Sequence, residues 1–136
     1  MKNTVTLDEF TTAYIEAALW VSNDDSGEPL DKNYSVDDIA ADTLAAIVND
    51  CAKFQFSPEW QAVLSAEDDA RTPRRQKHGC SIEGSAGHDF WLTRCGHGAG
   101  FWDGDWIEPH ATALDKLSES FGDVDLYVGD DGKIYS

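Results

Sequence analysis

Four side chains that can bind zinc or take part in nucleophilic catalysis lie between positions 80 and 97. They are Cys80, His88, Cys95 and His97, and both residue types ligate zinc. The segment holds no Cys-x-x-Cys pair, and its spacing matches no standard zinc finger. Cys95 and His97 are expected in one tight turn, where both side chains do not easily face one ion. We therefore expect no metal or other cofactor, and we keep the four residues as an alternative site.

An acid–base site is a second alternative in this segment. His88, Asp89 and His97 supply groups that can transfer protons. Cys95 beside either histidine would form a nucleophilic pair. No local signature of the known thiol enzymes surrounds these residues. We therefore favour a glycine-rich turn between two strands, and a protein without enzymatic activity.

Negative charge dominates the composition. The chain of 136 residues carries 26 acidic and 10 basic side chains, a formal net charge of -16. Because nucleic-acid binding through phosphates needs clustered Lys and Arg, we expect no direct nucleic-acid binding. The field would instead attract a basic protein partner. The candidate partner-binding surface is a set of acidic residues near the C-terminus: Asp103, Asp105, Glu108, Asp115, Glu119, Asp123, Asp125, Asp130 and Asp131.

The charge is unevenly distributed along the chain. Residues 1–50 hold eleven acidic against two basic side chains, and residues 98–136 hold nine against two. Residues 51–97 hold six of each and are neutral. Within this neutral part, the basic residues Arg71, Arg74, Arg75 and Lys77 are expected to form a loop, because Pro73 interrupts regular structure.

Hydrophobic periodicity and end signals predict the elements that position these groups. Helices are expected over about 7–22, about 36–54, a shorter stretch from Pro58, and from Pro109 to about 121. Strands at 89–94 and 99–102 would form one β-hairpin, and residues 124–135 a second around Asp131-Gly132. We therefore expect a single α+β domain over 1–136: three N-terminal helices, a β-hairpin, a further helix and a C-terminal β-hairpin, forming a small antiparallel sheet packed by helices.

No apolar run approaches the roughly 20 residues of a membrane span, so we expect no membrane partner. The N-terminal residues are polar and lack the pattern of a signal peptide. We therefore expect a cytoplasmic protein.

Two segments resemble a set of small, uncharacterised proteins of tailed bacteriophages and prophages. The first reads GHDFWLTR over 87–94 and GHGAGFWD over 96–103, and the second reads LYVGDDGKIY over 126–135. In that set, Asn commonly stands where this chain has Cys95. The resemblance implies a phage origin and action in the cytoplasm of the host cell, and it implies no activity.

These observations lead to three hypotheses. We favour an acidic phage protein that binds and inhibits a nucleic-acid-binding protein of the host or its defence systems. Its carboxylates would imitate the phosphates of DNA or RNA, as an inhibitor of the anti-restriction or anti-CRISPR type would. The alternatives are a small phage enzyme that uses the His/Gly-rich hairpin, and a structural or assembly accessory that acts as a homodimer.

Overall fold

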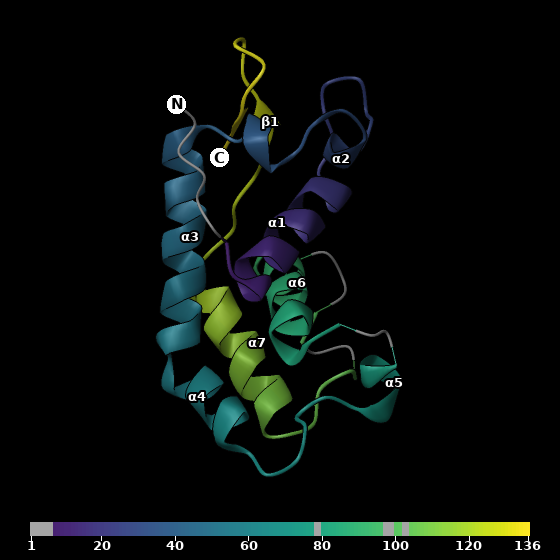
Figure 1. Ribbon diagram of the computed structural model, residues 1–136, viewed down its shortest axis with the longest axis vertical. Helices are drawn as coiled ribbons and strands as arrows, with labels where there is room; N and C mark the ends of the chain where they lie inside the picture. Colours follow the sequence, from purple (N-terminus) through teal and green to yellow (C-terminus); the bar gives the residue numbers. More distant parts are fainter. Residues whose placement is uncertain (1–6, 78–79, 97–99, 102–103) are drawn as a thin grey trace.

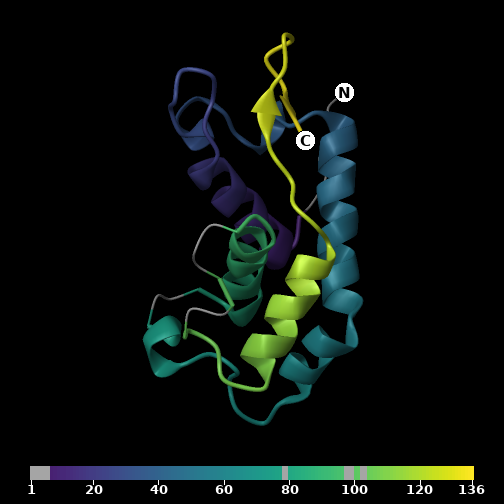
Figure 2. The ribbon, with the colours of Figure 1, turned by 180° about the vertical axis from the view of Figure 1, so that it is seen from behind.

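The structure is a computed structural model that describes residues 7–77, 80–96, 100–101 and 104–136, and helices make up most of it (Figure 1). The C-terminal hairpin and α2 lie at one end of the long axis, and α4 and α5 lie at the other (Figures 1 and 2). In chain order the elements are α1 Glu9–Val21, α2 Leu30–Asn33, the 3-10 helix η1 Val36–Asp38, α3 Ala41–Phe56, α4 Pro58–Ser65, α5 Pro73–Gln76, α6 Ile82–Arg94, α7 His110–Ser120, β1 Tyr127–Val128 and β2 Ile134–Tyr135.

The pair α1 and α6 forms the centre of the fold. Gly87 allows these helices to approach closely, because a Cβ atom at that position would lie 2.0 Å from the backbone oxygen of Phe10. Their facing aromatic rings also meet, with the centroids of Tyr14 and Phe90 5.2 Å apart. The close backbone approach therefore depends on the absence of one side chain.

A cluster of buried aromatic rings joins this pair to the other helices. Phe54 of α3 lies with its ring centroid 4.6 Å from that of Phe90 and 5.9 Å from that of Phe101. Phe101 in turn packs edge-on against Trp106 at 5.2 Å. Such stacked, tilted and edge-to-face pairs add to the stabilisation from apolar burial. The core therefore draws on segments from both halves of the chain.

The predicted strand at 89–94 is wrong, because these residues form the second half of α6. Phe90, Trp91 and Leu92 are all buried. A helix buried on nearly every side has no polar face, so its sequence does not differ in periodicity from a buried strand. Of the predicted partner strand, Gly100 and Phe101 lie in a bend and a turn. Ala99 and Trp102 lie outside the described residues.

The predicted helix over 36–54 begins later than expected. Ser35 caps the short η1 helix, not α3, which starts at Ala41. Between them, Ala40 donates its backbone N–H to the carbonyl oxygen of Ile134 at 2.9 Å. Ile39 forms a parallel bridge with the same residue. A pairing from the far end of the chain thus replaces the first turn of the expected helix.

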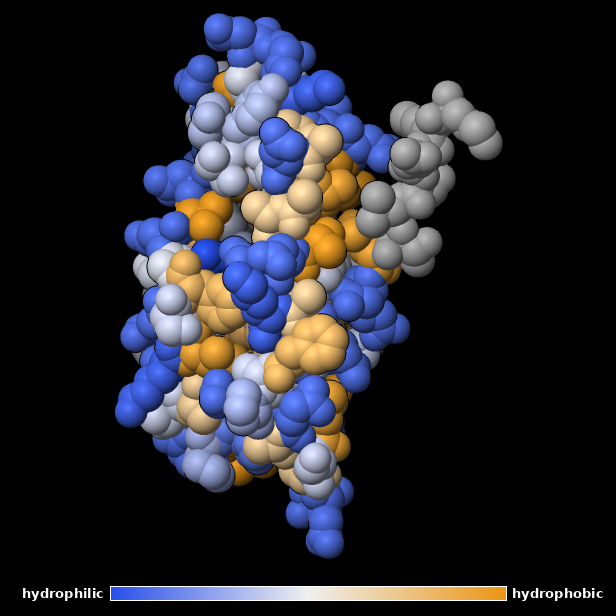
Figure 3. Space-filling model, turned by 90° about the vertical axis from the view of Figure 1, so that its left-hand side faces the viewer, coloured by the Kyte–Doolittle hydropathy of each residue, from blue (hydrophilic) through white to orange (hydrophobic). Residues whose placement is uncertain are grey.

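The other predicted helices need smaller corrections. The first helix begins at Glu9, with Asp8 as its cap. The helix predicted from Pro58 is α4, and on this helix Leu64 is 49% exposed. The face that carries α3 and α4 is a mixture of hydrophobic and hydrophilic side chains (Figure 3).

The C-terminal segment forms a two-stranded antiparallel sheet in which Tyr127 pairs with Tyr135 and Val128 with Ile134. Gly132 adopts a φ of 79° in the connecting turn, which favours glycine. Helices combined with this small antiparallel sheet confirm the α+β class.

Candidate functional site

The sequence predicts a loop for the basic segment 71–77, and this prediction is wrong because residues 73–76 form helix α5. Pro73 occupies the first position of helix α5, and Thr72 caps that helix by accepting the N–H of Arg75. Proline interrupts a helix only in its interior, whereas at the first position its missing N–H is not needed. Of the two arginines in this short helix, Arg75 is buried and Arg74 is exposed.

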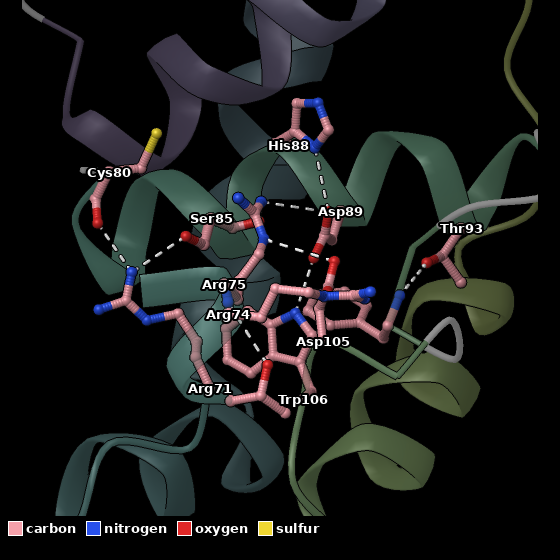
Figure 4. A network of polar contacts seen from close by, with 12 residues as sticks. Arg71, Arg74, Arg75, Cys80, Ser85, His88, Asp89, Thr93, Asp105 and Trp106 are labelled. Carbon is pink, nitrogen blue, oxygen red and sulfur yellow. Dashed lines mark hydrogen bonds and ion pairs between the residues drawn. The ribbon is translucent and has the colours of Figure 1, made fainter. Parts of the chain in front are cut away.

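Arg71 joins the segment before α5 to the start of α6 (Figure 4). Its guanidinium binds both carboxylate oxygens of Asp69, at 3.0 and 2.7 Å. It also donates to the carbonyl oxygen of Cys80 at 2.7 Å and to Oγ of Ser85 at 3.1 Å. The hydrogen bond from Arg71 lowers the pKa of the Asp69 carboxyl. This guanidinium is therefore buried with its hydrogen bonds satisfied.

A second ion-pair network lies around Asp89 of α6, and Figure 4 shows its members converging from three segments. Arg75 approaches Oδ1 of Asp89 at 3.4 Å, and the side chains are 10% and 5% exposed. The indole N–H of Trp106 donates to the other oxygen at 2.7 Å. Arg74 pairs with Asp105 at 2.6 Å, beside Arg75. The network fixes Asp89 and holds α5 against α6.

The structure brings together two of the three predicted acid–base residues. Nδ1 of His88 lies 3.0 Å from Oδ1 of Asp89. Because the carboxylate accepts, we assign the proton of the neutral ring to Nδ1, which leaves Nε2 as an acceptor. Nε2 points away from Asp89 (Figure 4). His97 lies outside the described residues. In this arrangement the carboxylate of Asp89 orients the imidazole of His88, as carboxylates orient the general bases of enzymes.

An open groove of about 1270 Å³ borders this pair. Residues of α1, α2, α5 and α6 line it, with His88 and the exposed Cys80 among them. Trp20 of α1 stacks on His88, with ring centroids 6.5 Å apart and an interplanar angle of 29°. Apolar and charged side chains thus meet in one concave surface, as in ligand-binding clefts.

The predicted zinc ligands Cys80 and Cys95 lie far apart, and His97 lies outside the described residues. Cys80 precedes α6 and Cys95 follows it. The 13 residues of this helix span about 20 Å, so the two thiols cannot hold one ion. Cys95 instead donates to the carbonyl oxygen of Val124 at 3.3 Å. Within the described residues, no three His, Cys, Asp or Glu side chains are grouped as a metal site requires.

Several of the predicted partner-binding acids have internal roles. Asp105 is paired with Arg74, and Glu108 accepts the backbone N–H of Thr112 at 2.8 Å, at the start of α7. Asp131 accepts from the hydroxyl of Tyr135 and the backbone of the hairpin turn. These carboxylates therefore also stabilise the fold. Asp103 lies outside the described residues.

The remaining predicted acids follow α7 and the segment that runs up to the hairpin, along the long axis (Figure 2). Glu119, Asp123, Asp125 and Asp130 are exposed. Asp115 is half-buried, and burial together with the charge of Glu119 raises the pKa of its carboxyl. We define the acidic edge as these residues together with Glu108 and Asp131, which lie on the same segments; it comprises Glu108, Asp115, Glu119, Asp123, Asp125, Asp130 and Asp131.

Sequence reasoning missed two residues of the groove. Trp20 lies outside the apolar stripe of its helix, and a large aromatic residue away from the buried face is a signal of an exposed ring. Arg75 carried no such signal, because its partner Asp89 is 14 residues away. Only the folded chain brings these two side chains together.

Comparisons with protein-family models, with curated proteins and with solved structures found no match. Among the described residues, no helix has both the length and the apolar character needed to cross a membrane.

Proposed function

We propose that this protein binds a basic protein partner through its acidic edge. The observation that supports this proposal most directly is that each arginine in the described part of the chain pairs with a carboxylate of the same chain. Arg71 pairs with Asp69, Arg74 with Asp105, Arg75 with Asp89 and Arg94 with Asp50. The guanidinium groups therefore offset buried or half-buried carboxylates, whereas the surplus carboxylates face solvent.

The acidic edge has the charge needed for such a partner. In the described part of the chain, Glu119, Asp123, Asp125 and Asp130 form no ion pair. Exposed like charges repel one another and destabilise the compact state, and a basic partner surface relieves that repulsion. The same field accelerates the encounter with a positively charged surface.

The class of partner that fits best is a nucleic-acid-binding protein of a bacterial host or of its defence systems. The Lys and Arg side chains of such proteins are arranged to neutralise phosphates. A row of carboxylates can occupy the same side chains and thereby inhibit the protein. The resemblance to phage proteins supports this class, because phages act inside cells that carry such defences.

The test is capture of bacterial proteins on the immobilised chain, followed by competition with duplex DNA. We expect basic nucleic-acid-binding proteins to bind at about 50 mM salt and to be released at about 500 mM, because salt screens exposed charges. Duplex DNA should displace them. The variant E119Q/D123N/D125N should lose most of this capture.

A matched control neutralises three exposed acids outside the acidic edge, in the variant D25N/D37N/E67Q. This variant has the same net charge as the first and should retain the capture. Equal loss in both variants would show a general effect of net charge, and unchanged capture by the first variant would contradict the proposal.

Acid–base catalysis at His88 is the second candidate function, and the 3.0 Å contact between His88 and Asp89 favours it. The contact orients the imidazole so that its free nitrogen is available at the groove. A hydrolase activity lost in His88→Gln and retained in E119Q/D123N/D125N would favour this candidate over partner binding.

A further inference from the structure

Trp20 is an unusual feature of the groove, because its indole ring is 59% exposed. One face of the ring stacks on His88. Because Trp20 is this exposed and stacks on His88 with one face only, its opposite face is in contact with solvent. Exposed tryptophan rings in concave surfaces are typical anchors of binding sites.

The groove also carries negative charge that the fold does not neutralise. Glu16 and Asp31 line it and are exposed. Glu16 lies four residues before Trp20 on α1, so the two side chains share one helix face. Within the described residues, neither carboxylate forms an ion pair or hydrogen bond. The groove's other two carboxylates are those held by Arg74 and Arg75.

We propose that this groove binds an arginine side chain of a peptide or protein ligand. A planar guanidinium stacks on an indole face and retains its N–H donors for carboxylates at the rim. Glu16 and Asp31 would accept those donors, and Nε2 of His88 is a further acceptor in the lining of the same groove. A lysine ammonium lacks the planar surface for stacking and is bound more weakly.

This inference goes beyond the proposed function, because the site differs from the acidic edge. The groove involves α1, which lies towards the viewer in Figure 1, whereas α7 of the acidic edge lies towards the viewer in Figure 2. Arginine binding in the groove therefore does not require a partner on α7. Variants in the two places separate the two proposals.

The experiment titrates the full ¹⁵N-labelled chain with the peptide acetyl-Gly-Arg-Gly-amide and follows NMR cross-peaks. A second peptide has citrulline in place of arginine, which keeps the shape and removes the charge. We expect the indole N–H of Trp20 and the amide of His88 to shift saturably with the arginine peptide. The citrulline peptide should bind about tenfold more weakly, because the cation–π and ionic attractions are lost.

Substitutions then assign the site. Trp20→Ala should weaken binding of the arginine peptide about tenfold, and Glu16→Gln should weaken it several-fold. Phe56→Ala is the control, since Phe56 is 83% exposed and does not line the groove. It should bind like the unaltered chain, and all three variants should keep the melting temperature.

Three results would overturn this proposal. They are equal binding of the arginine and citrulline peptides, unchanged binding by Trp20→Ala, and shifts confined to α7 and the hairpin. The last result would favour the acidic edge as the cation-binding surface. Loss of protein capture by E119Q/D123N/D125N, with peptide binding retained, would support both sites independently.

Discussion

The arginines of this acidic chain act mainly as internal connections. Arg71 has a side chain 9% exposed and binds Asp69, Cys80 and Ser85. Arg94 similarly reaches Asp50, Tyr14 and the carbonyl oxygens at the end of α7. Breaking such a buried pair leaves a charge without its partner, which is costly. Residues that suggest a basic surface in the sequence therefore stabilise the interior.

Arg71→Met should lower the free energy of unfolding by about 3 kcal/mol at neutral pH, because Asp69 and two acceptors lose their donor. Urea denaturation measures this change. Arg74→Met is the matched control, since the Arg74 side chain is 72% exposed. It should cost about 1 kcal/mol or less. Equal effects of the two substitutions would show that Arg71 is not the structural connection described above.

The cost of Arg71→Met should also depend on pH. The hydrogen bond from Arg71 lowers the pKa of Asp69 in the folded protein, so ionised Asp69 stabilises the fold. That stabilisation is complete above the unfolded value of about 3.9 and disappears as the pH falls through the lower folded value. The difference between the two proteins should therefore shrink below about pH 4. If the difference in unfolding free energy between the two proteins did not change with pH, the cost of Arg71→Met would not come from ionised Asp69.

At the residue scale, the sequence identified part of the site. His88 and Asp89 adjoin in the sequence, and the structure does bring their side chains into contact. Trp20, Arg75 and Trp106 complete the surroundings from other segments. Their contacts with α6 depend on how the chain folds back, which spacing along the sequence does not contain.

At the scale of elements, the contact between α1 and α6 depends on Gly87. Alanine is the better helix former by about 1 kcal/mol, so helix propensity alone predicts that Gly87→Ala stabilises. The structure predicts the opposite, because the new methyl group would overlap the backbone of Phe10. We expect a loss of about 3 kcal/mol or more in the free energy of unfolding, measured by urea denaturation.

Gly84→Ala is the control for this prediction, on the same helix. Its new Cβ atom would lie 3.2 Å from Oγ of Ser81, the cap that accepts the N–H of Gly84, so a shift of a few tenths of an ångström is enough to relieve the contact. The change in stability should stay within about 1 kcal/mol. A stabilised Gly87→Ala variant would contradict the close packing of α1 on α6.

The elements differ in how well the sequence predicts them, and the reason is burial. Helices α3 and α7 have one buried and one exposed face, so their apolar residues recur with helical spacing. Helix α6 buries nine of its 13 residues and lacks this contrast. The predicted start of α3 is also wrong. The residues before α3 pair with Ile134, about 95 positions away, and local sequence patterns do not contain such a long-range contact.

At the scale of the whole molecule, the net charge of -16 affects stability as well as binding. Because three of the four arginines are buried in internal pairs, repulsion among the exposed carboxylates is only partly offset at the surface. The melting temperature should rise as the salt concentration increases from about 10 mM to about 500 mM. Over that range the Debye length, the distance over which charges act on one another, falls from roughly 30 Å to a few Å. Calorimetry measures this rise.

The variant E119Q/D123N/D125N should show a smaller rise in melting temperature, because three of the repelling charges are absent. A melting temperature that does not depend on salt would indicate that the exposed charges lie too far apart to repel one another.

The bridge between Ile39 and Ile134 has a consequence for how the protein is made. Ribosomes deliver the chain from its N-terminus, so Ile39 emerges long before its partner is synthesised. Ile134 is fully buried and accepts the N–H of Ala40, the residue that precedes α3. The segment before α3 therefore acquires its final arrangement only after Ile134 has left the exit tunnel, and translation fixes the earliest moment at which this bridge can form.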